Sequence, residues 1–194
     1  MIKNEYNSLI DLVRENVVTE PEDAKQLFSK MQEARKKGFL TKEEFLQICM
    51  WKSPRPKKHY LSNSEENINK ITKEAFLTSS EELKISFLTS LKGVSIPVAS
   101  AILTSINPQD YGVIDIRVWQ TLHTYEQVET KPKGQGFILS DWIIYLSILR
   151  KYAEILKLRA RDIEIILFFY HKKKQIGNLY SLQKTENNNI HKTE

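Results

Sequence analysis

Apolar residues recur every three or four positions along almost the whole chain, as they do on one face of an α-helix. One such face carries Ala24, Leu27, Phe28 and Met31. No segment alternates apolar and polar residues with the period of two that a half-buried strand requires. The pattern therefore predicts an all-α fold of roughly nine helices. The predicted helices cover residues 2–13, 21–38, 41–49, 63–76, 79–91, 95–107, 115–123, 140–149 and 162–170.

The ends of several helices are indicated by residue type. Gly38 is placed to end the second helix, and Thr41 opens a capping box at the start of the third. The two prolines in 53–56 must break helix, because each disfavours the α conformation in the residue before it. Ser140 or Asp141 is expected to begin the long helix near the C-terminus.

Length and composition allow one core, or two small lobes that share a cleft, in a chain of 194 residues that is 41% hydrophobic. We predict an N-terminal helical segment over 1–50, a helical core over 51–171, and a basic polar tail over 172–194 that is disordered. A single Cys49 and four scattered histidines predict no disulfide, no metal and no cofactor. No apolar run spans a bilayer, so we expect a cytoplasmic, monomeric protein without membrane contact.

The net charge of +5 is concentrated in two places. The segment 52–59 holds four basic residues and no acidic one, and the tail from His171 holds five lysines against two glutamates. Two local basic patches on a nearly neutral body suit a polyanion bound along one face. The alternative is a solvated loop and a tail that only aids solubility.

The stretch LKGVSIPVAS, which begins at Leu91, predicts two helices joined by a tight hairpin. Gly93 can take a positive φ at the end of the first helix, and Val94 can point inward. Ser95 can cap the second helix, and Pro97 falls in its first turn, where a missing N–H costs nothing. Such a hairpin presents backbone N–H groups beside a helix N-terminus, which suits a phosphate oxygen.

A carboxylate follows this hairpin at a fixed distance, at Asp115 in the run VIDIRVW. Asp115 is placed to cap the next helix. Either it serves only as a cap, or its carboxylate takes part in chemistry.

The pattern L-x-G-V-x-x-x-x-A-x-x-I-L followed by V-I-D-x-R-V resembles the helix–hairpin–helix DNA glycosylase superfamily of base-excision repair enzymes. The runs MWKSPR and ASAILTSINPQDYGVIDIRVW are similar to a small branch related to 8-oxoguanine glycosylases. The resemblance covers residues 51–170. It implies a double-stranded DNA partner with a damaged or modified base, in a nucleoid-associated cytoplasmic setting. It also implies that Asp115 stabilises the oxocarbenium sugar as the base leaves.

The resemblance also suggests which residues contact DNA. The expected backbone contacts are Lys92, Gly93, Val94, Ser95, Lys52, Arg55, Lys57 and Lys58. The expected walls of a base pocket are Trp51, Tyr60 and Tyr111. In the alternative interpretation Trp51 belongs to the core and the lysines are merely solvated.

Two departures from the family pattern limit the chemistry. Bifunctional members carry a Schiff-base lysine in the first turns of the hairpin's second helix, where this chain has Pro97. We therefore expect a monofunctional enzyme without lyase activity, unless Lys92 or Lys52 reaches the site from elsewhere. The hairpin's usual second glycine is Ser95. Four-cysteine iron–sulfur ligation is impossible with one cysteine.

Two other classes of function stay open. The first is a non-catalytic DNA-binding protein with the same hairpin, in which Asp115 only caps a helix. The second is a helical protein-interaction domain, in which the hairpin N–H groups are buried against the protein itself.

Overall fold

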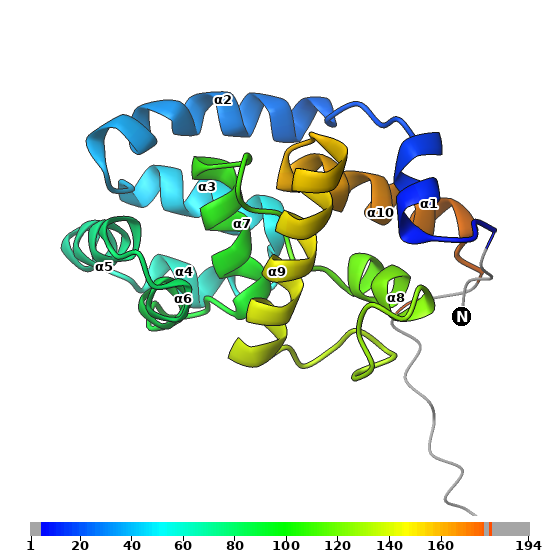
Figure 1. Cartoon of the computed structure of the whole chain (residues 1–194). Helices are drawn as coiled ribbons and strands as arrows, with labels where there is room; N and C mark the ends of the chain where they lie inside the picture. Colours follow the sequence, from blue (N-terminus) through cyan, green and yellow to red (C-terminus); the bar gives the residue numbers. More distant parts are fainter. Residues whose placement is uncertain (1–4, 177–178, 180–194) are drawn as a thin grey trace, which may run out of the picture.

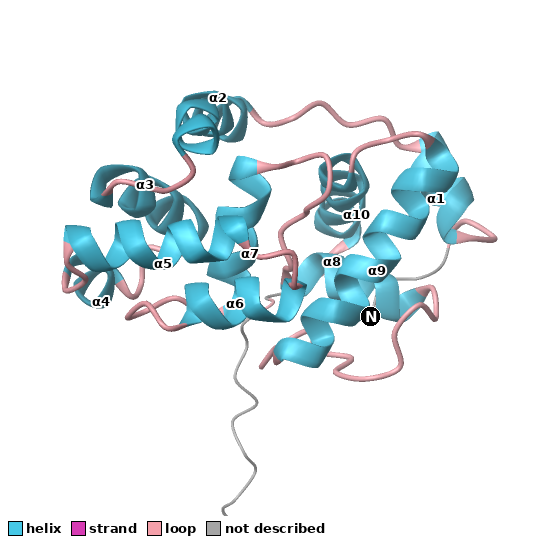
Figure 2. Cartoon of the chain, turned by 60° about the vertical axis from the view of Figure 1, so that its left-hand side comes forward, coloured by secondary structure: helices cyan, strands magenta, loops and turns pink. Residues whose placement is uncertain are grey.

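The chain folds as helices joined by turns and loops, as the apolar pattern predicts, and the described residues contain no strand (Figure 2). The computed structural model describes residues 5–176 and residue 179. Within them ten helices follow one another along the chain. They are α1 (Leu9–Glu15), α2 (Glu22–Lys37), α3 (Lys42–Lys52), α4 (Lys57–Leu61), α5 (Glu65–Leu77), α6 (Glu81–Thr89), α7 (Ile96–Ile106), α8 (Ile116–Thr124), α9 (Leu139–Leu156) and α10 (Ala160–Lys174).

Several predicted helix ends are confirmed. Gly38 ends α2 with φ of 79°, and Thr41 with Glu44 forms the capping box of α3. Ser64 and Ser80 cap the two helices predicted over 63–76 and 79–91, each accepting a backbone N–H at 3.2 Å. These ends are set by residues within four positions of one another, which explains why residue type alone predicts them.

Other boundaries differ from the prediction. The helix α1 begins at Leu9 after its cap Ser8, and residues 5–8 are not helical; the predicted start at residue 2 lies outside the described residues. The long helix α9 begins at Leu139, and neither Ser140 nor Asp141 is its N-cap. Instead, the Asp141 carboxylate reaches back from the first turn and accepts the N–H of Ile138 at 2.7 Å. A carboxylate in the first turn satisfies the same free amides as a cap does, so the sequence alone does not separate the two.

The sequence also missed α4, which lies in the predicted basic loop. Pro56 occupies its N-cap position, where proline needs no N–H partner. One turn of helix after a proline carries no apolar periodicity of its own. It is held by burial of Tyr60, which packs against Phe45 of α3 with ring centroids 6.1 Å apart.

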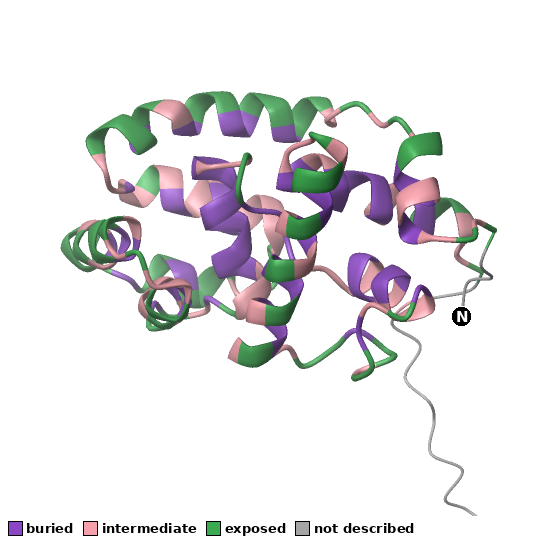
Figure 3. Ribbon diagram, in the orientation of Figure 1, coloured by how far each residue is buried: buried purple, intermediate pink, exposed green. Residues whose placement is uncertain are grey.

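The core does not divide into two lobes. Helix α7 is central and its residues from 98 to 106 are all buried, while α2 lies across α3 and α7 with its outer face exposed (Figures 1 and 3). Buried apolar residues from all ten helices belong to one cluster. The predicted boundary at residues 50 and 51 falls inside α3, and the predicted start of the tail at 172 falls inside α10. Most of the tail lies outside the described residues.

None of the helices described here combines the length and the apolar character that crossing a membrane would need.

Candidate functional site

The turn between α6 and α7 has the backbone that the sequence predicts. Gly93 has φ of +86°, and a Cβ atom at this position would lie 2.9 Å from the Cβ of His59. Val94 is buried. The positive φ and the close approach of α4 both require glycine here, so the turn and α4 form one packed unit.

The polar groups of this turn fall into two sets. The buried Asn63 side chain accepts the N–H of Lys92 at 2.9 Å and donates to the Lys92 carbonyl at 3.0 Å. The N–H groups of Gly93, Ser95 and Ile96 donate to no other residue that the structure describes. Ser95 occupies the predicted N-cap position of α7, but its hydroxyl makes no capping hydrogen bond with the described residues. Ser95 is exposed, and Gly93 and Ile96 on either side are partly buried.

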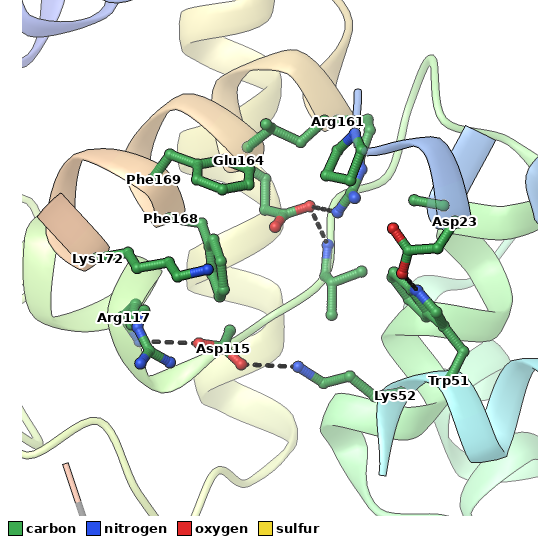
Figure 4. Close-up of a pocket in the computed structure, with 14 residues that line it drawn as sticks. Asp23, Trp51, Lys52, Asp115, Arg117, Arg161, Glu164, Phe168, Phe169 and Lys172 are labelled. Carbon is green, nitrogen blue, oxygen red and sulfur yellow. Dashed lines mark hydrogen bonds and ion pairs between the residues drawn. The ribbon is translucent and has the colours of Figure 1, made fainter. Parts of the chain in front are cut away.

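The predicted basic residues separate into two groups. Arg55, Lys57, Lys58 and Lys92 are exposed, on α4, the loop before it and the turn that packs against it. Lys52 is partly buried at the C-terminal end of α3 and points toward Asp115 (Figure 4). The four exposed cations share one part of the surface, whereas Lys52 belongs to a pocket.

Asp115 is fixed by two interactions. As the N-cap of α8, it accepts the N–H of Arg117 on Oδ1 at 3.0 Å, which confirms the predicted cap. Its Oδ2 lies 2.8 Å from Nζ of Lys52. The Asp115 side chain is 20% exposed and that of Lys52 is 15% exposed, so both stay reachable. The pair joins α3 to α8 across 63 positions of sequence.

These contacts also set the charge of Asp115. Burial alone would raise the pKa of its carboxyl group. The Lys52 ammonium and the Arg117 N–H outweigh that effect and hold the pKa below its usual value. The site therefore presents a fixed, ionised carboxylate at neutral pH.

Asp115 and Lys52 line a pocket of about 370 Å³ between α2, α3, α8 and α10. Figure 4 shows Trp51 on one side and Phe168 on the other, with Asp115 and Lys52 at one end. The volume lies in the range of small-molecule sites, roughly 300–1,000 Å³. The lining residues are Pro21, Asp23, Ala24, Trp51, Lys52, Val113, Asp115, Arg117, Arg161, Glu164, Ile165, Phe168, Phe169 and Lys172.

The other end of the pocket is a buried ion-pair cluster. Glu164 is 3% exposed, pairs with Arg161 and accepts the N–H of Val113 at 3.2 Å. Arg161 also donates to Glu20 at 2.8 Å. Burial raises the pKa of Glu164 although Arg161 opposes the change. The cluster fixes the segment that leads into Asp115, two residues after Val113.

Of the three residues predicted as walls of a base pocket, one lines the pocket beside Asp115. Trp51 lines the pocket, and its Nε1 donates to Asp23 at 3.0 Å. Tyr60 is fully buried and does not line this pocket. Tyr111 is also buried and stacks on Trp142, with ring centroids 6.3 Å apart. The expectation for these two tyrosines is therefore corrected, because their apolar rings pack into the core.

Sequence reasoning missed several pocket residues. Phe168, Phe169 and Lys172 come from the last turns of α10, and Arg117 follows the cap of α8. Arg117 lies over the Phe168 ring, 5.3 Å from its centroid. One signal was available, since Glu164 is a lone carboxylate in the apolar run 163–170. Such a residue needs a buried partner, and so points to a polar site.

In the part of the chain that the structure describes, no three or more His, Cys, Asp or Glu side chains are placed to hold a metal ion. Comparison with known proteins returns no family model, no curated protein and no solved structure that matches this chain. What the site can do therefore follows from its own residues.

Those residues combine three capacities. The Asp115 carboxylate can stabilise positive charge that develops on a bound ligand. The rings of Trp51 and Phe168 can contact the faces of a flat group. Arg117 and Lys172 place positive charge along the same pocket, where it can balance a phosphate.

Proposed function

We propose that the protein is a DNA N-glycosylase of the helix–hairpin–helix superfamily, which binds duplex DNA and releases a damaged or modified base. The observation that carries the proposal is the position of Asp115. The residue that follows the hairpin at the family's spacing lies in a pocket, with its carboxylate fixed by Arg117 and Lys52.

The chemistry of base release fits this carboxylate. Cleaving an N-glycosidic bond generates positive charge at C1′ of the sugar. A carboxylate that is already oriented and ionised stabilises that charge in the transition state without reorganising. The base must first leave the stack, and a pocket with Trp51 and Phe168 as walls offers it a place.

The amides of the turn and the exposed cations near it supply the grip on DNA. The free N–H groups of Gly93, Ser95 and Ile96 suit a phosphate oxygen at the N-terminus of α7. Lys57 and Lys58 lie on α4, which packs against this turn. The loop 53–56 connects α4 directly to Lys52 of the pocket. A backbone strand bound at the turn and α4 is therefore held close to the pocket.

The test is base release from duplexes that each carry one oxidised, deaminated or alkylated base. The wild-type chain is compared with Asp115→Asn, which keeps the size of the side chain and removes its charge. Free base is measured by chromatography. We expect release by the wild type from at least one duplex, and loss of release in the variant. Equal release by both proteins, or release by neither, would contradict the proposal.

A non-catalytic DNA-binding protein is the second candidate. It is favoured by the fact that capping α8 and pairing with Lys52 already account for Asp115. It predicts salt-dependent duplex binding without base release, and binding that Asp115→Asn leaves unchanged. The third candidate, a protein-interaction domain, required buried hairpin amides, and the exposed Ser95 gives it no support.

A further inference from the structure

Glu164 lies at the end of the pocket away from Asp115, and one of its two carboxylate oxygens has no partner. The side chain is 3% exposed and lines the pocket. Its two hydrogen bonds, from Nη1 of Arg161 and from the N–H of Val113, both reach Oε2. Oε1 accepts no hydrogen bond from any residue that the structure describes. A buried acceptor without a donor is costly, so this oxygen marks a place where a ligand can donate.

The free oxygen is open to the pocket. Figure 4 shows it turned away from Arg161, toward the side of the pocket where Phe168 lies. The indole N–H of Trp142 also has no partner among the described residues, but it is sealed in the core, whereas Oε1 of Glu164 is not. Whichever oxygen of Glu164 takes the two donors, the other one faces the pocket. A ligand therefore always meets an acceptor at this end.

An acceptor at this position meets the edge of a flat ligand. Because the rings of Trp51 and Phe168 would contact the faces of a nucleobase, its pairing edge is left to meet the end of the pocket. An ionised carboxylate oxygen offers lone pairs and no hydrogen. It is stabilised by N–H groups, and it is repelled by ring nitrogens and carbonyl oxygens that present lone pairs of their own.

The other carboxylates of the pocket do not have this role. Asp115 uses both oxygens, since Oδ1 accepts the N–H of Arg117 and Oδ2 pairs with Lys52. Asp23 is exposed and accepts Nε1 of Trp51, so water can reach it. Among the lining residues, Glu164 alone combines a buried carboxylate with an oxygen that no described residue contacts.

We propose that Glu164 is the specificity-determining residue of the pocket, and that its free oxygen selects nucleobases with N–H donors on neighbouring atoms of the pairing edge. This inference rests on the proposed function for the view that the ligand is a nucleobase. It adds the chemical class of that base, one that donates rather than one whose edge carries only lone pairs. The base can belong to a nucleotide turned out of DNA or to a free nucleotide, and the experiment separates these sources.

The variant Glu164→Gln inverts the group that faces the pocket. Arg161 and the N–H of Val113 will hold the amide oxygen as they hold Oε2, so the NH₂ group of glutamine faces the ligand. Glu20→Gln is the matched control, because Glu20 is the other partner of Arg161 and does not line the pocket. Unfolding midpoints show whether each variant is folded.

The probes are three purine deoxynucleoside monophosphates that differ in the N–H donors of the pairing edge. Guanine has donors on two neighbouring atoms, hypoxanthine has one, and unsubstituted purine has none. Binding is measured by NMR titration, in which the indole signal of Trp51 reports the pocket and those of the fully buried Trp119 and Trp142 serve as references. We expect the wild-type affinity to fall about tenfold for each donor removed. Glu20→Gln should keep this order, and Glu164→Gln should reverse it.

The same three bases are then placed in duplexes opposite an abasic site, so that base pairing does not hide the comparison. A wild type that treats the bases alike in both forms, or binds neither form, overturns the inference. So does a Glu164→Gln variant that keeps the wild-type order. A proton on Oε1 would make the wild type follow the order expected of the variant, which also overturns it.

The two proposals fail in different ways. Base release that ignores the donors of the base would remove the role of Glu164 and leave the glycosylase proposal standing. The expected order for free nucleotides, with no base release from any duplex, would do the reverse, and the pocket would then be a site for a free nucleotide.

Discussion

Two ion pairs of the same chemistry sit in very different surroundings. Lys52–Asp115 and Lys131–Asp141 each join a lysine to an aspartate at the start of a helix, α8 in one case and α9 in the other. The first pair spans 63 positions of sequence and the second only 10. The long-range pair lines a pocket, whereas the local pair does not.

The aspartate of the local pair is more buried, although its lysine is less so. The Asp141 side chain is 6% exposed against 20% for Asp115, whereas Lys131 is 26% exposed against 15% for Lys52. Lys131 donates as well to the carbonyl of Gly136 at 2.9 Å, so the pair fastens the loop before α9 onto the helix. The comparison teaches that two ion pairs of the same residue types can differ in access to a cavity. Only the packing of the helices around each pair decides that access.

The largest expected difference between the pairs is in base release. Asp115→Asn should lower the rate by about 100-fold or more, the usual cost of removing a preorganised electrostatic contact. Asp141→Asn should leave the rate within about twofold, because Asp141 does not line the pocket. Single-turnover kinetics on a responsive duplex measure both. A similar loss in the two variants would mean that the pairs do not differ in function.

The order should reverse for stability. Lys131→Met leaves the sealed Asp141 carboxylate without its counter-ion, which we expect to cost about 2–3 kcal/mol of unfolding free energy. Lys52→Met should cost less, about 1 kcal/mol, because Asp115 keeps more contact with solvent. Urea denaturation of both variants checks the order. Equal costs would argue that the two pairs are equally buried.

The pH dependence of stability sharpens the contrast between the two pairs, because His171 interacts electrostatically with Asp115 of the long-range pair. Burial and the charge of Arg117 lower the pKa of His171 to about 4. Since the unfolded residue binds its proton near pH 6.5, the contribution of His171 is complete above that pH and is lost as pH falls toward 4. We expect a loss of about 1–2 kcal/mol by pH 5.

His171→Gln should remove this part of the pH dependence while keeping a partner for Gln120, which contacts His171 Nε2 at 2.7 Å. Unfolding free energies measured between pH 7 and pH 5 compare the two proteins. A wild-type profile that the variant reproduces would show that His171 titrates normally.

The smallest expected effect is on the affinity for duplex DNA, when one exposed lysine from the segment near each pair is removed. Lys57→Ala should weaken binding to every duplex a few-fold and lower the slope of log affinity against log salt by about 1. Lys133→Ala, which removes an exposed lysine from the loop of the local pair, should change neither. Binding measured at several salt concentrations tests this. Equal slopes for the two variants would place the DNA contact elsewhere.

Local interactions explain what was predictable. The all-α fold, the glycine at the α6–α7 turn, the capping box at Thr41 and the cap at Asp115 depend on residues a few positions apart. The one-turn helix α4 was missed because its single buried ring, Tyr60, acts through distant partners.

The make-up of the pocket depends on packing, and no local signal specifies it. Phe168 and Phe169 become walls only because α10 packs against α8, and Tyr111 leaves the expected wall because its ring stacks on Trp142. Helical periodicity says which residues share a face, but it does not say which other helix that face meets.

The contact between Lys52 and Asp115 shows most clearly what the sequence predicts and what depends on tertiary packing. Residue types alone predict a capping carboxylate after a glycine turn, and a proline in the first turn of the helix between them. Only the tertiary structure placed Lys52 against that carboxylate. The reason is physical, because a contact across 63 positions depends on how α3 and α8 pack around the core, which neither helix encodes alone.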